Sequence, residues 1–421
     1  MKTSIKSVKA REILSTSGYP TIETIVVLED GTAGIVSVPY GTSAGVHEAI
    51  TLFDGDPKRY KGRGMLKAIE NVNKIIGPEV IGKDASDQRS IDDLLISLDP
   101  SPQRANLGGN AILSVSLACA RASAISRQVP LYQHIRQTYS LPHKDYRLPK
   151  PMMVVIEGGA HADNSTDFQE YLVGVIADQG ARKNVQIGIE IYLTLAKILK
   201  QKGYSTNVGT EGAFAPTAIK SNEEPLMHIE KAISEAGYKP GVDAAIALDP
   251  AASEFYGEDG MYHLERDGRV LSSQEMISLY EDLVSRYPIF SLEDGLSEDD
   301  WDAWPSLNAT LGSKIMIIGD DLTVTNVERL KRAIELKVMN AILIKPNQCG
   351  TLSETIDAID LAQKNGLKTV VSHRGGGETT DTFIIDLAVA TNSEFVKVGP
   401  TRGERVVKYN RLMEIADELG K

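Results

Sequence analysis

Cysteine, aromatic residues and long apolar runs are all scarce in this sequence. Only 2 of its 421 residues are cysteine, and 6% are aromatic. Cys119 and Cys349 lie far apart and lack the close spacing of a disulfide framework, a zinc site or a redox motif. No segment approaches the about 18 consecutive apolar residues of a membrane-spanning helix, and the first residues alternate in polarity instead of forming a signal-type apolar core. We therefore expect a reduced, cytoplasmic protein with no membrane partner.

Positive charge is also in deficit. The chain has 45 Lys and Arg against 57 Asp and Glu, a formal net charge of −12, and its basic residues do not cluster with aromatic ones. We therefore expect no nucleic-acid partner, because a phosphate backbone is bound by such clusters. Two explanations of the excess carboxylates stay open: exposed helices that keep a soluble protein from associating, and carboxylates gathered for divalent metal ions.

The length of 421 residues exceeds what one hydrophobic core usually organises, so we expect two domains. With 42% hydrophobic and 24% charged residues, the composition is that of a globular α/β protein. Residues 3–40 alternate apolar and polar around turn signals, which predicts a three-stranded antiparallel meander, and helical spacing follows over 64–137. We predict an α+β domain over residues 1–137, a linker over 138–150 and a larger domain over 151–421.

After residue 150, short apolar strands alternate with amphipathic helices, the pattern of a parallel β/α barrel. Five of these strands end in an ionisable residue: Ala245–Asp249, Ile289–Glu293, Ile315–Asp320, Ala341–Lys345 and Thr369–His373. Charged residues also begin ordinary loops, but five in succession favour an active site at the C-terminal ends of the strands. The expected fold is α/β, with a C-terminal TIM-like barrel after the smaller α+β domain.

Three of the strand ends are carboxylates that would project into one cavity. Asp249, Glu293 and Asp320 supply the hard oxygen ligands that magnesium prefers, with positions left for water and substrate. Three carboxylates without a cation would repel one another, so their convergence predicts a metal site. The alternative is that each carboxylate pairs with a neighbouring Lys or Arg.

Proton transfer has candidates at neighbouring positions. Lys345 ends an apolar strand, where burial and a nearby dication would depress its pKa and make it a base; binding of an anionic substrate is its alternative role. Glu211 lies in a Gly-rich loop and Glu170 follows Asp167-Phe168-Gln169. Two carboxyl groups close together tend to hold one proton between them, which predicts an acid at these residues.

Together these segments resemble the enolase family over about residues 5 to 420. The most specific matches are Gly158-Gly159-Ala160-His161-Ala162-Asp163-Asn164, Asp167-Phe168-Gln169-Glu170, Ala247-Leu248-Asp249, Ala251-Ala252-Ser253-Glu254-Phe255-Tyr256, Glu293-Asp294-Gly295-Leu296, Gly319-Asp320-Asp321-Leu322, Leu343-Ile344-Lys345, Ser372-His373-Arg374 and Glu404-Arg405. Further matches are Arg11-Glu12-Ile13-Leu14, His47-Glu48-Ala49 and the run from Leu107 to Leu113.

The resemblance implies magnesium-dependent dehydration of 2-phosphoglycerate to phosphoenolpyruvate, a step of glycolysis and gluconeogenesis. It implies one magnesium ion on Asp249, Glu293 and Asp320, and a second, arriving with substrate, held with help from Ser43. Lys345 is then the base and Glu211 the acid.

The other implied roles are support of Glu211 by Glu170, closure of the site by His161, and substrate contacts by Gln169, His373, Arg374, Gly375 and Lys397. Of these, Lys397 is expected at the substrate carboxylate, and His373 and Arg374 at its phosphate. A homodimer or a ring of dimers is also implied.

Several positions depart from the usual pattern of the family, and most lie around the substrate. The closing loop reads Tyr40-Gly41-Thr42-Ser43-Ala44-Gly45 where Ser-Gly-Ala-Ser-Thr-Gly is usual, and the first motif reads Ser15-Thr16-Ser17-Gly18-Tyr19-Pro20 where Asp-Ser-Arg-Gly-Asn-Pro is usual. Gly375 replaces a phosphate-contacting Ser, Thr210 an Asp and Glu157 an Asn. The expected metal carboxylates and the proton-transfer residues are retained.

Three functions therefore stay open. The first is dehydration of 2-phosphoglycerate. The second keeps the mechanism but acts on a phosphonate or another phosphorylated 2-hydroxy acid, and the departures support it. The third is a scaffold that has kept the fold and lost the reaction; retention of Lys345, Glu211 and the metal carboxylates argues against it.

Overall fold

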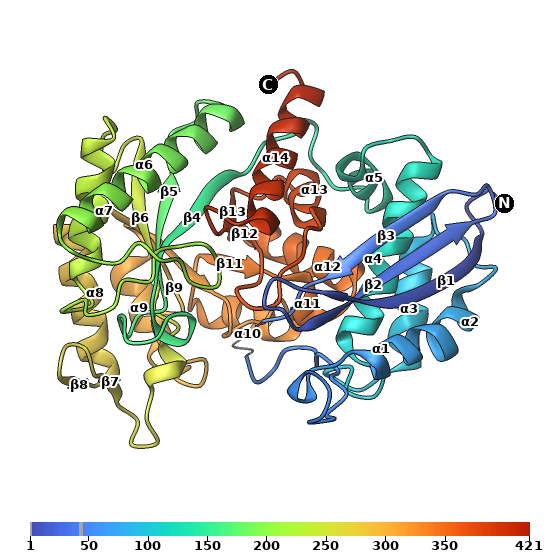
Figure 1. Ribbon diagram of the computed structural model, residues 1–421, viewed down its shortest axis with the longest axis horizontal. Helices are drawn as coiled ribbons and strands as arrows, with labels where there is room; N and C mark the ends of the chain where they lie inside the picture. Colours follow the sequence, from blue (N-terminus) through green and yellow to red (C-terminus); the bar gives the residue numbers. More distant parts are fainter. Residues whose placement is uncertain (1, 42–44) are drawn as a thin grey trace.

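A computed structural model describes residues 2–41 and 45–421 of the chain. Its N-terminal part is a three-stranded antiparallel sheet in the order β1-β2-β3, flanked by helices (Figure 1). The elements are β1 (Ile5–Leu14), β2 (Pro20–Leu28), β3 (Ala33–Val38), α1 (Leu66–Asn71), α2 (Gly77–Val80), α3 (Gln88–Leu98), α4 (Gly109–Ser126) and α5 (Leu131–Thr138). This confirms the predicted α+β arrangement.

The sheet and α4 pack closely because small residues meet at their interface. Helix α4 is buried over most of its length and contacts β2 and β3. A Cβ atom on Gly34 of β3 would lie 2.3 Å from the backbone oxygen of Ala118, so only glycine allows this approach of strand to helix backbone.

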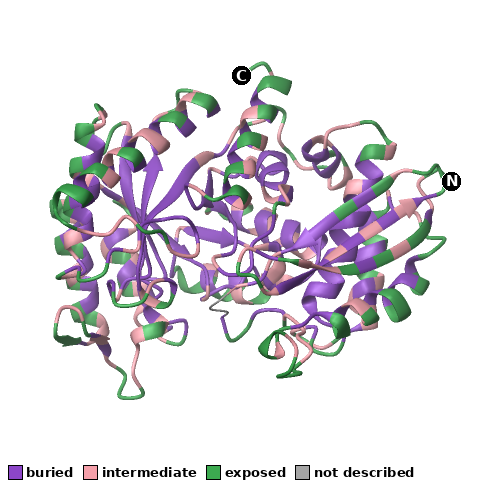
Figure 2. Cartoon of the chain, viewed as in Figure 1, coloured by how far each residue is buried: buried purple, intermediate pink, exposed green. Residues whose placement is uncertain are grey.

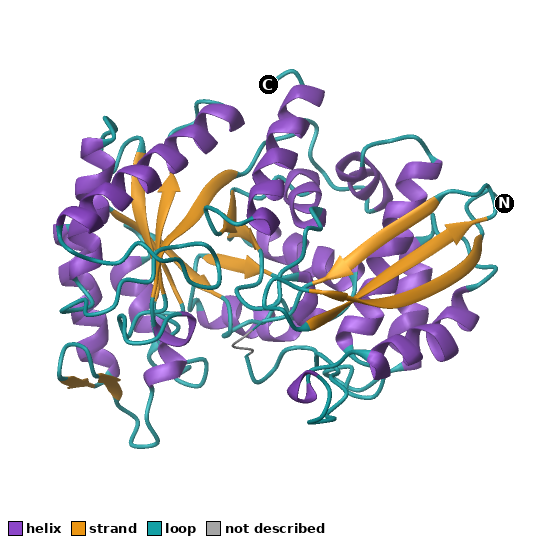
Figure 3. Cartoon of the chain, viewed as in Figure 1, coloured by secondary structure: helices purple, strands orange, loops and turns teal. Residues whose placement is uncertain are grey.

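The C-terminal part is a closed barrel whose strands are drawn in orange in Figure 3. The strand order around the barrel is β10-β11-β12-β13-β4-β5-β6-β9. The strands are β4 (Lys150–Glu157), β5 (Glu170–Val175), β6 (Ala244–Asp249), β9 (Ile289–Glu293), β10 (Met316–Gly319), β11 (Ala341–Ile344), β12 (Lys368–Ser372) and β13 (Phe395–Val398). The five strands predicted to end in ionisable residues are all present. Their terminal or following residues lie at one rim of the barrel.

One strand differs from the parallel arrangement predicted from the sequence. β5 is antiparallel to both of its neighbours, β4 and β6. Between β4 and β5 the chain has only the short 3₁₀ turn Gly159–His161 and no crossover helix, so it turns back instead of returning to the start of a parallel strand. Because β5 runs in reverse, its first residue, Glu170, lies beside Glu157 and Asp249 at the C-terminal rim.

Helices surround the barrel, and its strands are almost wholly buried (Figure 2). The remaining helices are α6 (Ala181–Gln201), α7 (Glu224–Glu235), α8 (Ser273–Arg286), α9 (Trp304–Leu311), α10 (Val327–Leu336), α11 (Pro346–Cys349), α12 (Leu352–Lys364), α13 (Phe383–Ala390) and α14 (Gly403–Glu418), and a hairpin is formed by β7 (Tyr262–Leu264) and β8 (Arg269–Leu271). Among the described residues, no helix combines the length and the apolarity needed to cross a bilayer.

The N-terminal part contacts the rest of the chain through a part-buried ion pair and a pair of backbone hydrogen bonds. Arg121 of α4 donates to both carboxylate oxygens of Asp381 at 2.7 Å. Tyr40 and Gly377 exchange two backbone hydrogen bonds, which ties the end of the sheet to the loop after β12. The start of the chain therefore forms part of the wall around the barrel rim. The division of the chain at residues 138–150 stays a prediction.

Candidate active site

The C-terminal ends of the barrel strands surround one small polar cavity. Its lining contains His161, Gln169, Glu170, Glu211, Asp249, Asp320, Lys345, His373, Arg374, Gly375 and Lys397. Glu293 is not part of this lining but contacts Lys397, which is. Ser43 lies outside the described residues. The topology thus brings the other predicted site residues together.

Lys397 on β13 lies at the centre of three carboxylates. Its Nζ atom is 2.9 Å from Glu170, 2.7 Å from Asp249 and 2.7 Å from Glu293. Burial opposes the charge of Lys397, but the neighbouring Asp249, Glu170 and Glu293 raise its pKa well above the usual value. Asp249 and Glu293 therefore have the lysine partner that the alternative interpretation of these carboxylates expected.

Asp320 has a lysine partner of its own. Its Oδ2 atom accepts a hydrogen bond from Lys345 Nζ, and its Oδ1 accepts one from Gln348 Nε2 at 2.8 Å. Thr325 Oγ1 accepts from the Lys345 backbone N–H at 3.0 Å and donates to Gln348 Oε1 at 2.7 Å. These bonds fix Asp320 and Lys345 at the ends of adjacent strands.

The protein's own groups do not depress the pKa of Lys345, so the expected low pKa depends on the dication and stays a prediction. Burial lowers the pKa of Lys345, but contact with Asp320 outweighs it and holds the pKa above the usual value. A neutral Lys345 therefore requires Asp320 to engage another cation.

Carboxylates outnumber cations in this part of the cavity, and the residues fit a divalent cation. Asp294, Asp320 and Asp321 form a group whose ligand oxygens lie within 4.8 Å of one another. Burial and neighbouring carboxylates raise the pKa values of Glu293, Asp294 and Asp321 well above their ordinary range. Glu293 Oε2 is buried without a hydrogen-bond donor. Crowded anionic oxygens of this kind are the ligands that magnesium prefers.

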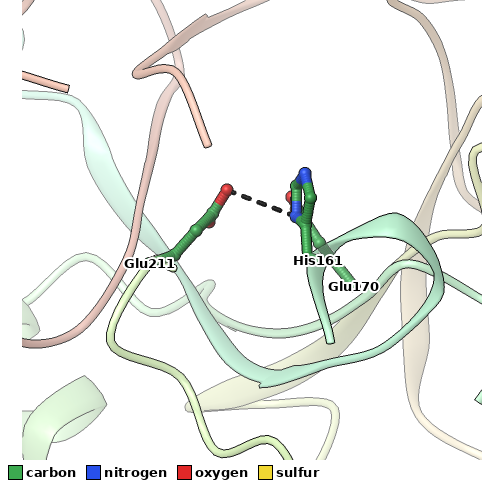
Figure 4. Close-up of side chains that lie close together, drawn as sticks. All are labelled: His161, Glu170 and Glu211. Carbon is green, nitrogen blue, oxygen red and sulfur yellow. Dashed lines mark ion pairs between the residues drawn. The ribbon is translucent and has the colours of Figure 1, made fainter. Parts of the chain in front are cut away.

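His161, Glu170 and Glu211 form a second ionisable group in the cavity (Figure 4). His161 Nδ1 lies 3.3 Å from Glu170 Oε1 and 3.5 Å from Glu211 Oε1. Burial opposes the charge of His161, but the two carboxylates raise its pKa to about 9. Both carboxylates contact the same imidazole nitrogen, and their charges favour an imidazolium at His161. A proton held between Glu170 and Glu211 stays a prediction.

Glu211 also contacts the next strand end. His373 Nε2 lies 3.0 Å from Glu211 Oε2, and both side chains are buried. Burial raises the pKa of Glu211, but His373 and His161 outweigh this, so the pKa lies below the usual value. The protein's own groups thus keep Glu211 as a carboxylate next to a protonated His161.

Arg374 is held by a residue of the N-terminal part. Its Nη1 and Nη2 atoms donate to Glu48 Oε2 and Oε1 at 2.9 and 3.2 Å. Gln348 Nε2 also donates to Glu48 Oε1, at 3.3 Å. Glu48 therefore connects the guanidinium expected at the phosphate to the Asp320 end of the cavity.

Gly375 leaves space that its neighbours fill. A Cβ atom at this position would lie 2.4 Å from Glu211 Oε1 and 2.7 Å from the His161 ring. Both contacts involve the far ends of side chains. A side chain at residue 375 would therefore displace the His161–Glu211 pair without touching backbone.

Three of the other departures from the family pattern, Ser15, Ser17 and Tyr40, contact one another. The Tyr40 hydroxyl lies 2.8 Å from Ser17 Oγ and 3.3 Å from Ser15 Oγ. Its ring lies against Gly377, where a Cβ atom would come within 2.2 Å of it. These positions form one packed set in the wall beside Gly375. Ala44, also a departure, lies outside the described residues.

The structure gives a place in the site to residues for which the sequence analysis predicts no role. Asp294 accepts from the backbone N–H groups of Asp320 and Asp321 at 2.9 and 2.8 Å. Asp294 and Asp321 each directly follow a predicted metal ligand. Two adjacent acidic residues at each of two strand ends are a sequence pattern from which their place in the site could have been predicted. Glu48 and Gln348 carry no such signal, because they are 300 positions apart and meet only through the fold.

Comparison with protein families gives two matches that follow one another along the chain. The model described as "Enolase, N-terminal domain" matches residues 5–135, and that described as "Enolase, C-terminal TIM barrel domain" matches residues 145–421. The first covers the sheet β1–β3 with its helices, and the second covers the whole barrel. The chain therefore belongs to the enolase family.

Proposed function

We propose that this enzyme catalyses magnesium-dependent dehydration of 2-phosphoglycerate to phosphoenolpyruvate. Its two family matches make it an enzyme of the enolase superfamily, of the hydro-lyase kind. The observation that carries the finer proposal is one cavity lined by Lys345, by the His161–Glu211 pair and by Arg374. A base, an acid and a cation for a phosphate are thus available to one small substrate.

In the proposed reaction Lys345 Nζ takes the proton from C2. The electron pair of the C2–H bond forms the double bond to C3 as the C3–O bond breaks. The departing hydroxide leaves as water with a proton from the His161–Glu211 pair, in which His161 Nδ1 lies 3.5 Å from Glu211 Oε1. Glu170, 3.3 Å from His161 Nδ1, helps to keep that imidazole protonated.

Enolase-family proteins bind Mg²⁺, and we assign the first ion to Asp249, Glu293 and Asp320 and a second to a site with Ser43. When bound, magnesium stabilises the negative charge that develops on the substrate carboxylate. Lys397 is proposed to bind that carboxylate, His373 and Arg374 the phosphate, and Gln169 another part of the substrate. Lys397 contacts Asp249 and Glu293 directly, so substrate and metal binding are expected to depend on each other.

The test is the rise in ultraviolet absorbance that accompanies phosphoenolpyruvate formation. Purified protein is mixed with 2-phosphoglycerate, first with magnesium and then with excess chelator. Metal-dependent turnover at the rates typical of enzymes, about 1 to 10³ s⁻¹, supports the proposal. Absence of turnover by folded protein in saturating magnesium would exclude this substrate.

We further propose a homodimer or a ring of dimers in the cytoplasm, with no nucleic-acid or membrane partner. The family membership supports the oligomer. Light scattering of the purified chain measures its mass in solution. A monomer at micromolar concentration would contradict the proposal.

A second candidate substrate is a phosphonate or another phosphorylated 2-hydroxy acid. The contacts among Ser15, Ser17 and Tyr40 favour it, because substitutions that fit one another are less expected from independent drift. Loss of the Ser hydroxyl at Gly375 removes a hydrogen bond to an anion, about 1.5 to 3 kcal/mol. Assaying 2-phosphoglycerate and its phosphonate counterpart side by side by phosphorus NMR separates the two candidates. Turnover of neither, by folded and magnesium-loaded protein, would favour the non-catalytic scaffold.

Gly375→Ala is expected to lower turnover by about 10- to 100-fold while leaving the melting temperature nearly unchanged. The added methyl group must displace Glu211 and His161, and a displacement of about 1 Å near the reacting atoms costs up to about 100-fold. Gly403→Ala is the matched control, since a Cβ atom there meets nothing within 4 Å. Full activity of Gly375→Ala would show that turnover does not depend on the close packing of residue 375 against Glu211 and His161.

A further inference from the structure

Glu157 carries no role in the proposed reaction, yet its side chain is fully buried at the end of β4. Its Oε1 atom accepts hydrogen bonds from the backbone N–H groups of Glu211 at 2.9 Å and Ala213 at 3.1 Å. Its Oε2 atom accepts from Thr210 Oγ1 at 3.3 Å. One carboxylate thus contacts three successive parts of the loop that carries Glu211.

The loop is shaped to receive this carboxylate. A Cβ atom on Gly209 would lie 2.2 Å from Glu157 Oε2, so a side chain there would exclude the carboxylate from its position. Backbone hydrogen bonds join β4 to the end of the same loop, from Glu157 N–H to Phe214 O at 2.9 Å and from Phe214 N–H to Val155 O at 3.0 Å. Backbone pairing fixes the end of the loop, and Glu157 fixes the part that holds Glu211.

The side-chain carboxylate and the backbone N–H of Glu211 are therefore bound by different groups. Its carboxylate contacts His161 and His373 in the cavity, whereas its backbone N–H is bound by Glu157 from outside the cavity lining. A shift of the backbone by a fraction of an ångström would move the carboxylate relative to both imidazoles. Positioning of this kind decides the rate of proton transfer, because the distance between donor and acceptor must stay within hydrogen-bond reach.

We propose that Glu157 is a positioning residue that orients Glu211, the carboxylate of the proton-donating His161–Glu211 pair, by accepting hydrogen bonds from the backbone N–H groups of its loop. The inference rests on the proposed role of Glu211 in the reaction. If the inference is right, the side chain at residue 157 must be a hydrogen-bond acceptor as long as glutamate, whereas its charge is less important. Glutamine meets that demand, and methionine, of similar shape, does not.

The experiment compares Glu157→Met with Glu157→Gln in two rates measured with 2-phosphoglycerate in deuterium oxide. One is exchange of the C2 hydrogen, which needs Lys345, and the other is dehydration, which also needs the acid. For Glu157→Met we expect dehydration to fall about 100-fold and C2 exchange to fall less than about 10-fold. For Glu157→Gln both rates are expected to stay within about 5-fold of the unaltered enzyme. Equal loss of both rates in Glu157→Met, or full dehydration activity in it, would overturn the inference.

A second measurement separates failure of this inference from failure of the proposed function. Hydrogen exchange with mass spectrometry follows the amides of residues 209–214 without any substrate. Glu157→Met is expected to exchange these amides at least about 10-fold faster, and Glu157→Gln at the original rate. Thr210→Val is the matched control, because it removes only the 3.3 Å hydroxyl contact and leaves both amide bonds. If the unaltered enzyme neither exchanges nor dehydrates 2-phosphoglycerate, the proposed function fails, and the amide rates alone decide the role of Glu157.

Discussion

Lys345→Ala is expected to lower the rate of dehydration by roughly 1000-fold or more, because general-base catalysis by one side chain contributes about 10² to 10⁴. Magnesium affinity should not weaken in this variant. Lys345 is bonded to Asp320, so its removal takes a competing cation away from a proposed metal ligand. Steady-state turnover and calorimetric titration with magnesium measure the two effects.

Lys368→Ala is the matched control for this prediction. Lys368 begins β12 and is exposed at the opposite end of the barrel, so it shares the charge of Lys345 but not its surroundings. Its variant is expected to keep full turnover and magnesium affinity. A Lys345→Ala protein that binds magnesium at least 10 times more weakly would show that the lysine supports the metal site instead of competing with it.

Glu293→Gln is expected to abolish the stabilisation of the protein by magnesium. Replacing one proposed ligand should weaken binding by more than about 100-fold, since even residues that only support metal ligands contribute 10- to 100-fold. The melting temperature of the unaltered enzyme is expected to rise with added magnesium, and in the variant this rise should be nearly absent. Turnover at moderate magnesium should fall with it.

The melting temperature measured in chelator distinguishes a metal ligand from a purely structural residue, because only loss of a structural residue should lower it. Glu293 lies among buried carboxylates, and its Oε2 atom has no hydrogen-bond donor. A neutral glutamine relieves that crowding, so the variant is expected to melt no lower than the unaltered enzyme when magnesium is removed. Glu281→Gln, on the exposed side of α8, makes the same charge change away from the site. It should leave unaltered both the melting temperature in chelator and its rise with magnesium. A Glu293→Gln protein that melts well below the unaltered enzyme in chelator would contradict this account.

Much of the fold could be predicted because local patterns determine it. Short apolar strands with ionisable ends predicted the barrel and the rim at which Asp249, Lys345 and His373 lie. The reversed direction of β5 could not be derived from strand patterns alone. It follows from what the chain lacks between Glu157 and Glu170, a helix long enough to cross over the barrel.

The sequence predicted which residues form the site better than it predicted which of them are protonated. The expected low pKa of Lys345 and the shared proton of Glu170 and Glu211 both assumed which groups would be nearest neighbours. In the structure Asp320 contacts Lys345, and His161 lies between the two glutamates. A pKa depends on separations of a few ångströms, and strand-end positions do not specify them.

Contacts between distant departures were also beyond the sequence. Tyr40 and Ser17 each appeared as a separate substitution, and only the fold brings them into one packed set with Gly377. The same holds for Glu157, whose value as an acceptor depends on the backbone of residues 211 and 213.

The most direct test of the central claim is exchange of the C2 hydrogen of 2-phosphoglycerate with deuterium oxide, followed by proton NMR in the presence of magnesium. The account predicts exchange with the unaltered enzyme, near-complete loss of exchange in Lys345→Ala, and continued exchange in the Lys368→Ala control. Undiminished exchange in a folded, magnesium-binding Lys345→Ala protein would show that another group removes the proton and would contradict the account.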